Sequence, residues 1–154
     1  MKLNTKIRYG LRTMIELGLS KNHEGLHQKD IAKNQVLSEK YLDPIIASLK
    51  VSGLIVNIAG KKSGYILKRP SSEIKIIDIY RTFEAGPYII HCINDPKTCK
   101  KTGICEAKEY WKGMNNLITE YLSSSTLEML VKQTEKNIKK TEKKSKAQKK
   151  AKAK

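Results

Sequence analysis

Three cysteines lie close together in one short segment of the 154-residue chain, HCINDPKTCKKTGIC, which runs from His91 to Cys105. Six residues separate Cys92 from Cys99, and five separate Cys99 from Cys105. The close C-x-x-C pairs typical of structural zinc sites are absent, whereas an iron-sulfur cluster accepts thiolates at wider spacing. Nearby lysines would offset the negative charge of a thiolate-bound cluster: Lys97, Lys100 and Lys101. The segment predicts an iron-sulfur ligand loop; direct thiol sensing and a vestigial loop are the alternatives.

The N-terminus lacks the features of a secretory signal. Charged residues run through the first 25 positions, and no stretch approaches 18 uninterrupted apolar residues. We therefore expect a cytoplasmic protein that does not enter a membrane. In a reducing cytoplasm, an odd number of clustered cysteines favours metal binding or redox chemistry over a disulfide framework.

The chain is strongly basic, with a formal net charge of +16. The last 23 residues hold 11 lysines against Glu135 and Glu142, so they supply +9 of this charge. The remaining +7 still fits a polyanionic partner, with nucleic acid ahead of an acidic membrane surface. The low-complexity tail over residues 133–154 is expected to be disordered. It could serve as a solubilising segment or as a non-specific DNA-binding arm.

The elements before the cysteine segment follow the order of a winged helix. Apolar residues at helical spacing predict a helix that begins at Thr5 as a plausible N-cap and ends before Gly25. HQKDIAKNQ predicts a short second helix, and SEKYLDPIIASLKVSG predicts a third, opened by Ser38 and closed by Gly53. The β-rich runs LIVNIAG and GYILKRP then predict a hairpin with a basic tip. The expected fold is mostly α with a small β wing.

Two further helices are expected around the cysteine segment. SSEIKIIDIYRTFEAG predicts a connecting helix, and EAKEYWKGMNNLITEYLSSS carries an apolar stripe over four turns. That stripe is either a core face or the contact with a second copy of the chain. A final short helix starts at the capping-box pattern Ser125-Thr126-Leu127-Glu128.

With these pieces in order, the chain resembles the Rrf-type winged-helix transcription regulators of bacteria, the family of IscR, NsrR and CymR. The residues that carry the resemblance are MKLNTKIRYGLRTM, LSEKYLDPIIASLKVSGLI, GKKSGYIL, IKIIDIYRTFE and the cysteine trio. It covers roughly residues 1–132. It implies a winged helix-turn-helix with its connecting helix over 1–85, a cluster-binding loop over 86–105, and a dimerisation helix with a short terminal helix over 106–132.

The resemblance also implies a homodimer whose long helices cross. Two third helices would then enter successive major grooves of a palindromic operator, about 34 Å apart. The positions that match the family's DNA-contacting residues are Ser38, Glu39, Lys40, Tyr41, Asp43, Lys61 and Lys62. Lys29 in the second helix is a further predicted DNA contact. Ala59 replaces the arginine with which an IscR-like wing enters the minor groove, so that member's operator does not transfer.

Cys92, Cys99 and Cys105 match the family's ligand trio, with one extra residue between the first two. The fourth ligand does not match: Lys108 stands where IscR-like members have histidine, and Arg8 where NsrR-like members take a carboxylate from the partner chain. The fourth donor therefore stays open among a residue of the partner chain, an exogenous ligand and four side chains of the chain itself: His91, Asp95, Glu106 and Glu109.

Pro44 leaves the start of the third helix open. If Ser38 is the N-cap, Pro44 lies inside the helix, where proline costs about 3 kcal/mol. Alternatively, Asp43 caps a helix that begins with Pro44.

The expected function is a dimeric, sequence-specific transcription regulator that senses iron-sulfur, redox or nitric oxide status. A cluster-free regulator controlled by thiol oxidation or a partner is the first alternative. A basic structural protein that binds nucleic acid without sequence preference is the second. An enzyme is not expected, because the sequence has no phosphate-binding glycine loop, nucleophile elbow or H-E-x-x-H motif.

Overall fold

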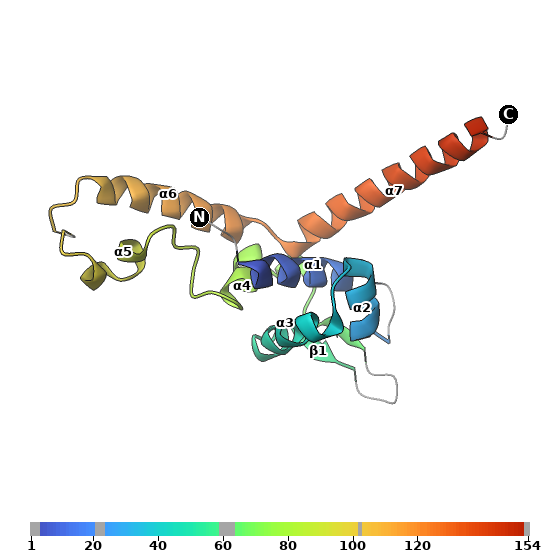
Figure 1. The fold of residues 1–154 in the computed structure, drawn as a ribbon, viewed down its shortest axis with the longest axis horizontal. Coiled ribbons are helices and arrows are strands. Elements are labelled where there is room, and N and C mark those ends of the chain that lie inside the picture. The colour runs from blue at the N-terminus through green and yellow to red at the C-terminus, as the bar shows by residue number, and fades with distance from the viewer. Residues whose placement is uncertain (1–3, 21–23, 59–63, 102, 153–154) are drawn as a thin grey trace.

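Helices make up most of the molecule, and a two-stranded wing lies at its lower edge (Figure 1). The computed structural model describes residues 4–20, 24–58, 64–101 and 103–152, with side chains through Ser145. No helix within these ranges is both long and apolar enough to cross a membrane.

The first three helices pack around one apolar core. They are α1 (Thr5–Leu19), α2 (Gln28–Gln35) and α3 (Glu39–Val51). Asn4, and not Thr5, caps α1, because the Asn4 side chain accepts a hydrogen bond from the Lys6 amide at 2.9 Å. The inward faces of the three helices supply five side chains with no exposed surface: Met14, Ile31, Leu42, Ile45 and Leu49.

The wing is an antiparallel pair of short strands, β1 (Ile55–Asn57) and β2 (Tyr65–Leu67). Leu26 adds one bridge to it, exchanging two backbone hydrogen bonds of 3.0 and 2.8 Å with Tyr65. At this bridge the backbone at Gly64 passes so close to the backbone of residues 24–25 that no side chain fits between them. A Cβ on Gly64 would lie 2.5 Å from the carbonyl oxygen of Glu24. The crossing fixes where the wing leaves the helical core.

The C-terminal half leaves this core as two arms. After the 3-10 turn η1 (Ser71–Glu73), α4 (Ile76–Arg81) leads to the small elements α5 (His91–Asn94) and η2 (Pro96–Thr98). The arm then returns along α6 (Ala107–Ser124), and α7 (Leu127–Lys152) points the other way (Figure 1).

The two arms meet at a backbone junction against the core. The Ile76 amide donates to the Ser125 carbonyl at 2.9 Å, and the Leu127 amide donates to the Ile74 carbonyl at 2.8 Å. Leu127 has no exposed surface, and Val131 packs on Gly18 of α1. The root of α7 is therefore part of the core.

The C-terminal tail differs from the expectation of a short helix followed by disorder over 133–154. One helix continues from Leu127 to Lys152. Lysine, glutamate, glutamine and alanine, which make up most of the tail, all have high helix propensity, and the packed root supplies the nucleus that an isolated helix lacks.

Candidate nucleic-acid interface and cysteine loop

Ser38 starts α3, which decides between the two alternatives at Pro44. The Ser38 hydroxyl accepts from the Tyr41 amide at 3.2 Å, and Pro44 lies inside the helix. Pro44 cannot donate a backbone hydrogen bond to Lys40, while its own carbonyl accepts from the Ser48 hydroxyl at 2.8 Å. The Lys40 carbonyl therefore receives no backbone hydrogen bond from position 44.

The predicted DNA contacts that the structure describes lie at the starts of α2 and α3. All six are exposed: Lys29, Ser38, Glu39, Lys40, Tyr41 and Asp43. Lys61 and Lys62 lie outside the described residues, as does Ala59.

Gln28 orders this surface, although sequence reasoning missed it. Its side-chain amide donates to the Asp43 carboxylate and, at 3.3 Å, to the Glu39 carbonyl. Asp43 is therefore held toward α2. The cue in the sequence is a polar residue at the first position of the second helix.

Tyr41 is anchored from α1. Its ring meets Tyr9 edge-on at 5.6 Å, and the Arg8 and Arg12 guanidinium groups lie 5.6 and 5.4 Å from the Tyr9 ring centre. Arg12 also donates to the Gln35 carbonyl at 2.6 Å. The edge-on ring contact thus joins α1 to α3, and the Arg12 hydrogen bond joins α1 to α2.

Val36, between α2 and α3, has a left-handed backbone, with φ of 54° and ψ of 51°. A β-branched residue is strained in this region. Its side chain is 88% exposed, so no packing compensates for the strain. The next amide, that of Leu37, donates to the Ala32 carbonyl at 2.8 Å and closes the turn.

The cysteine loop extends along the far arm. Cys92 lies in α5, Cys99 follows η2 and Cys105 lies just before α6; all three are half-buried and none forms a disulfide. Within the described ranges, no three His, Cys, Asp or Glu side chains come together as a metal site. The described arrangement of the loop therefore does not gather the three thiols around one centre.

Two of the open fourth-ligand candidates already have partners. The Asp95 carboxylate accepts from the Lys97 amide at 3.0 Å and so caps η2. Glu109 pairs with Lys112 at 3.6 Å. Glu106 is the residue before α6, with no side-chain capping bond, and His91 opens α5.

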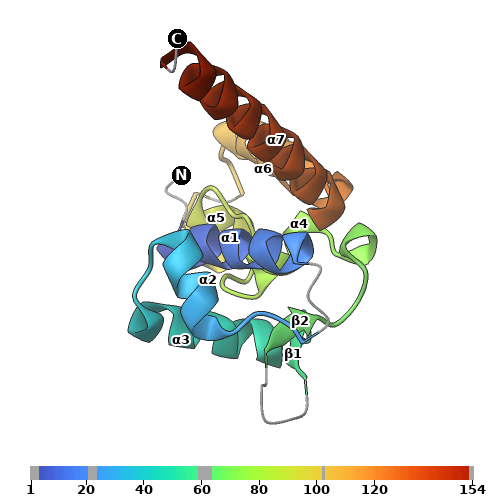
Figure 2. The ribbon, with the colours of Figure 1, turned by 90° about the vertical axis from the view of Figure 1, so that its right-hand side faces the viewer.

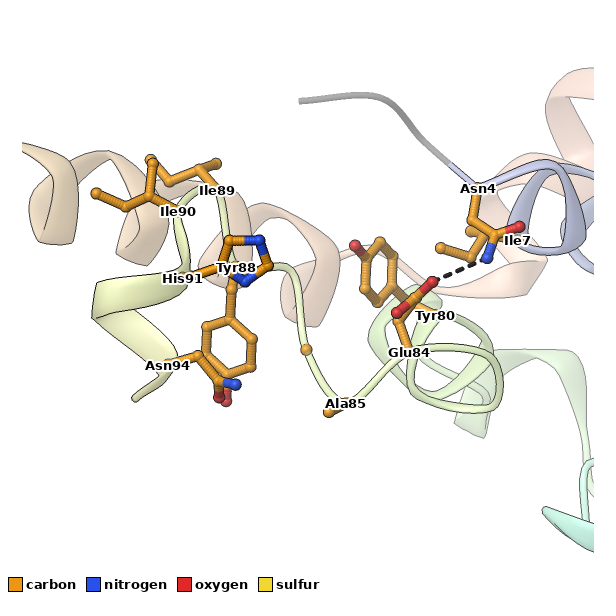
Figure 3. A pocket seen from close by; sticks show the side chains of 11 residues that line it. Asn4, Ile7, Tyr80, Glu84, Ala85, Tyr88, Ile89, Ile90, His91 and Asn94 are labelled. Carbon is orange, nitrogen blue, oxygen red and sulfur yellow. Dashed lines mark hydrogen bonds between the residues drawn. The ribbon is translucent and has the colours of Figure 1, made fainter. Parts of the chain in front are cut away.

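His91 also borders a cavity of about 370 Å³ between the core and residues 86–94, which we call the strap (Figure 3). Tyr88 and His91 lie on the strap side, and Asn4, Tyr80 and Glu84 lie on the core side. The Asn4 amide donates to Glu84 at 2.8 Å. Burial and the neighbouring Glu84 carboxylate raise the pKa of the Tyr80 phenol.

The strap is fastened to α6 by Asn115. This side chain is 6% exposed, and its oxygen accepts from the Ile89 amide at 3.2 Å. No pattern in the sequence separates Asn115 from the solvated Asn116 beside it, because only the fold brings residue 89 to α6.

The outward face of α6 is apolar. Tyr110, Leu117 and Tyr121 are 71%, 69% and 73% exposed, and Met114 is 44% exposed. Their spacing of four, three and four residues is that of a coiled-coil seam. These four side chains are therefore not part of the core of one chain, whereas Leu122 at the end of α6 packs against that core.

The comparisons with known proteins agree with this geometry. Residues 3–133 match the family model Rrf2, described as an iron-dependent transcriptional regulator. The chain belongs to the Rrf2 family. The HTH-type transcriptional regulator CymR of Bacillus subtilis (strain 168) is 33% identical over 135 residues, which cover 88% of this chain and 93% of CymR.

Two solved structures with similar folds complete the comparison. T. potens IscR has a TM-score of 0.72 and 32% identity, covering 89% of this chain and 90% of that one. The oxidized form of Staphylococcus aureus CymR has a TM-score of 0.67 and 32% identity, covering 85% and 96%. Membership of the Rrf2 family confirms the predicted winged helix-turn-helix, its DNA-binding regulatory role and the exclusion of an enzyme.

Proposed function

We propose that this Rrf2-family chain is a cytoplasmic homodimer that binds a palindromic operator and senses iron-sulfur, redox or nitric oxide status through Cys92, Cys99 and Cys105. The observation that carries the proposal is the position of all three cysteines in one segment that runs from the end of the strap to the start of α6. A cluster bound there would supply iron that reacts with oxidants and nitric oxide.

The exposed α6 seam supports the homodimer. Four large apolar side chains at coiled-coil spacing are too exposed for an isolated monomer, and a second copy would cover them with the same residues. A two-fold dimer presents two α3 helices, and half-sites one helical turn apart suit this arrangement.

The described contacts offer a route from the loop to the DNA-binding surface. The strap joins α6 through Asn115 and faces α1 across the cavity, where Asn4 and Glu84 link α1 to the end of α4. Helix α1 packs on α3 and holds Tyr41 through Tyr9. Rearrangement of the loop around a ligand would therefore shift the strap and bias the position of α3.

Anaerobic purification tests the sensor. Iron and acid-labile sulfide are counted per chain, and the visible absorption spectrum is taken before and after exposure to air. Stoichiometric iron and sulfide with a band that bleaches in air would support the cluster. Reconstituted protein that remains colourless would exclude it.

Direct thiol control is the second candidate, favoured by the separate positions of the three cysteines and by the oxidized form of the related CymR. It predicts colourless protein whose operator affinity changes with peroxide and recovers with dithiothreitol. In either case, replacing Cys92, Cys99 and Cys105 with alanine should remove the response. A response that survives in this variant would contradict both forms of sensing.

A further inference from the structure

Helix α7 carries a face made of lysines. At about 100° per residue, six lysines with described side chains fall within an arc of about 140°: Lys132, Lys136, Lys139, Lys140, Lys143 and Lys144. All six are exposed. Among the described side chains of α7, only Lys132 forms an ion pair, with Glu128 at 3.0 Å. We call this surface the lysine face.

The hydroxyl side chains on the opposite side of α7 already have hydrogen-bond partners within the helix. The hydroxyls of Thr134, Thr141 and Ser145 donate to the carbonyls of Leu130, Asn137 and Glu142 of the same helix, at 2.8 to 3.0 Å. Among the described side chains of α7, the lysines therefore lie on the side away from these hydroxyls. Lysines four residues apart repel one another along it, and a bound polyanion would relieve that repulsion.

Helix α7 points away from the DNA-reading surface. In both ribbon views, α7 rises from the top of α1, while α3 and the wing lie below the core (Figures 1 and 2). Most of the lysine face also lies beyond residue 133, where the family match ends. A duplex read by α3 would lie on the other side of the molecule.

We propose that the lysine face binds the phosphates of a second DNA duplex, so that one dimer bridges two DNA segments. From Lys132 to Lys144 the helix rises about 18 Å, which spans about five phosphates of one strand. Lysine serves such contacts as a point charge without base readout, so this duplex is bound without sequence preference. The inference rests on the proposed binding of an operator by α3.

The test uses the full chain bound to a short operator duplex on beads. The operator is first selected by enrichment of bound duplexes from a random-sequence pool. If no sequence is enriched, the proposed operator binding fails. The bead-bound operator is then replaced by a duplex of unrelated sequence, so that the lysine face can still be tested. A fluorescent 30-bp duplex of unrelated sequence is then added at several salt concentrations, and the retained fluorescence is measured. We expect capture that weakens steeply with salt.

The decisive variant replaces Lys136, Lys139, Lys140, Lys143 and Lys144 with glutamine, which keeps helix propensity. It should lose capture at least about tenfold while its affinity for the bead-bound duplex stays unchanged. The matched control replaces Thr134, Thr141 and Ser145 with glutamine on the opposite side, and should capture normally.

Three results would overturn the inference. The first is no capture by the unaltered chain, and the second is equal capture by the lysine variant. The third is preferential binding of polyglutamate or anionic vesicles over the fluorescent duplex in a competition at equal charge, which would assign the lysine face to an acidic protein or a membrane. Circular dichroism at 222 nm checks that both variants keep the α7 helix.

Discussion

Thr13 carries a buried hydroxyl that no hydrogen bond satisfies. It has no exposed surface, and its oxygen has no partner among the described atoms. An unsatisfied buried polar group costs about 1–3 kcal/mol, so Thr13→Val should stabilise the fold by about 1 kcal/mol. Thermal unfolding should show a rise of about 2–4 °C.

Thr119 is the matched control. It is also helical, but its hydroxyl donates to the Asn115 carbonyl at 2.9 Å. Thr119→Val should leave the melting temperature unchanged or lower it. Equal shifts in the two variants would mean that side-chain shape, and not the hydroxyl, decides the outcome.

Ser38 has two roles that substitution can separate. Asparagine is as good an N-cap as serine, so Ser38→Asn should keep the stability of α3, whereas Ser38→Ala should lose about 1 kcal/mol. If the hydroxyl contacts a base edge, Ser38→Asn should still weaken operator binding about tenfold. Urea unfolding and fluorescence anisotropy with a labelled operator measure the two effects. Unchanged operator affinity in the asparagine variant would confine Ser38 to capping.

At the scale of elements, the wing depends on the close crossing at Gly64. A methyl group there meets backbone atoms of Glu24 and Gly25, which cannot move aside as a side-chain tip can. Gly64→Ala should therefore destabilise the fold by more than about 1 kcal/mol and weaken operator binding. Denaturant unfolding and anisotropy measure both.

Gly113 provides the matched control for Gly64. A Cβ there meets nothing within 4 Å, and the residue lies within α6. Gly113→Ala should stabilise the fold by about 0.5–1 kcal/mol. Loss of stability in both variants would mean that the crossing at Gly64 has no special part.

The local elements could be predicted because each has a local physical cause. The apolar spacing of α3 and the two β-rich runs of the wing act within a few residues, and the structure forms a helix and an antiparallel strand pair there as expected. Ser38 is one of the two caps that the sequence left open. The N-cap of α1 was wrong by one residue, because Asn4 and Thr5 are both good caps. The extent of α7 depends on its packed root, which no local pattern reveals.

The candidate site was predictable in residue type and not in arrangement. The exposed start of α3 follows from its capping and amphipathic pattern. Gln28, Asn115 and Glu84 gain their roles from contacts 15, 26 and 80 residues away in the sequence. Whether three loop cysteines converge likewise depends on the path of the backbone, which their spacing does not specify.

At the scale of the whole molecule, the α6 seam should decide the oligomeric state. Leu117→Glu would bury a charge at the centre of the proposed dimer interface and should raise the dimer Kd at least about tenfold. Sedimentation velocity at several concentrations measures this.

Asn116→Glu places the same charge about 100° around α6 from Leu117, outside the apolar face, where the residue is also exposed, and should leave the dimer intact. Leu117→Glu should lower both dimerisation and operator affinity, whereas Asn116→Glu should lower neither. A monomeric unaltered chain, or a Leu117→Glu variant that stays dimeric, would assign the apolar face to some other contact.

The backbone junction between residues 74–76 and 125–127 makes the cysteine arm a closed excursion. The chain departs at Ile76 and returns at Ser125 to a position one hydrogen bond away. The entropic cost of closing this loop grows only slowly with its length. Insertions and deletions in the cysteine loop, which lies beyond the buried residues of α4, therefore weigh lightly on the stability of the winged helix-turn-helix. The length of this loop can change while the DNA-binding fold stays the same.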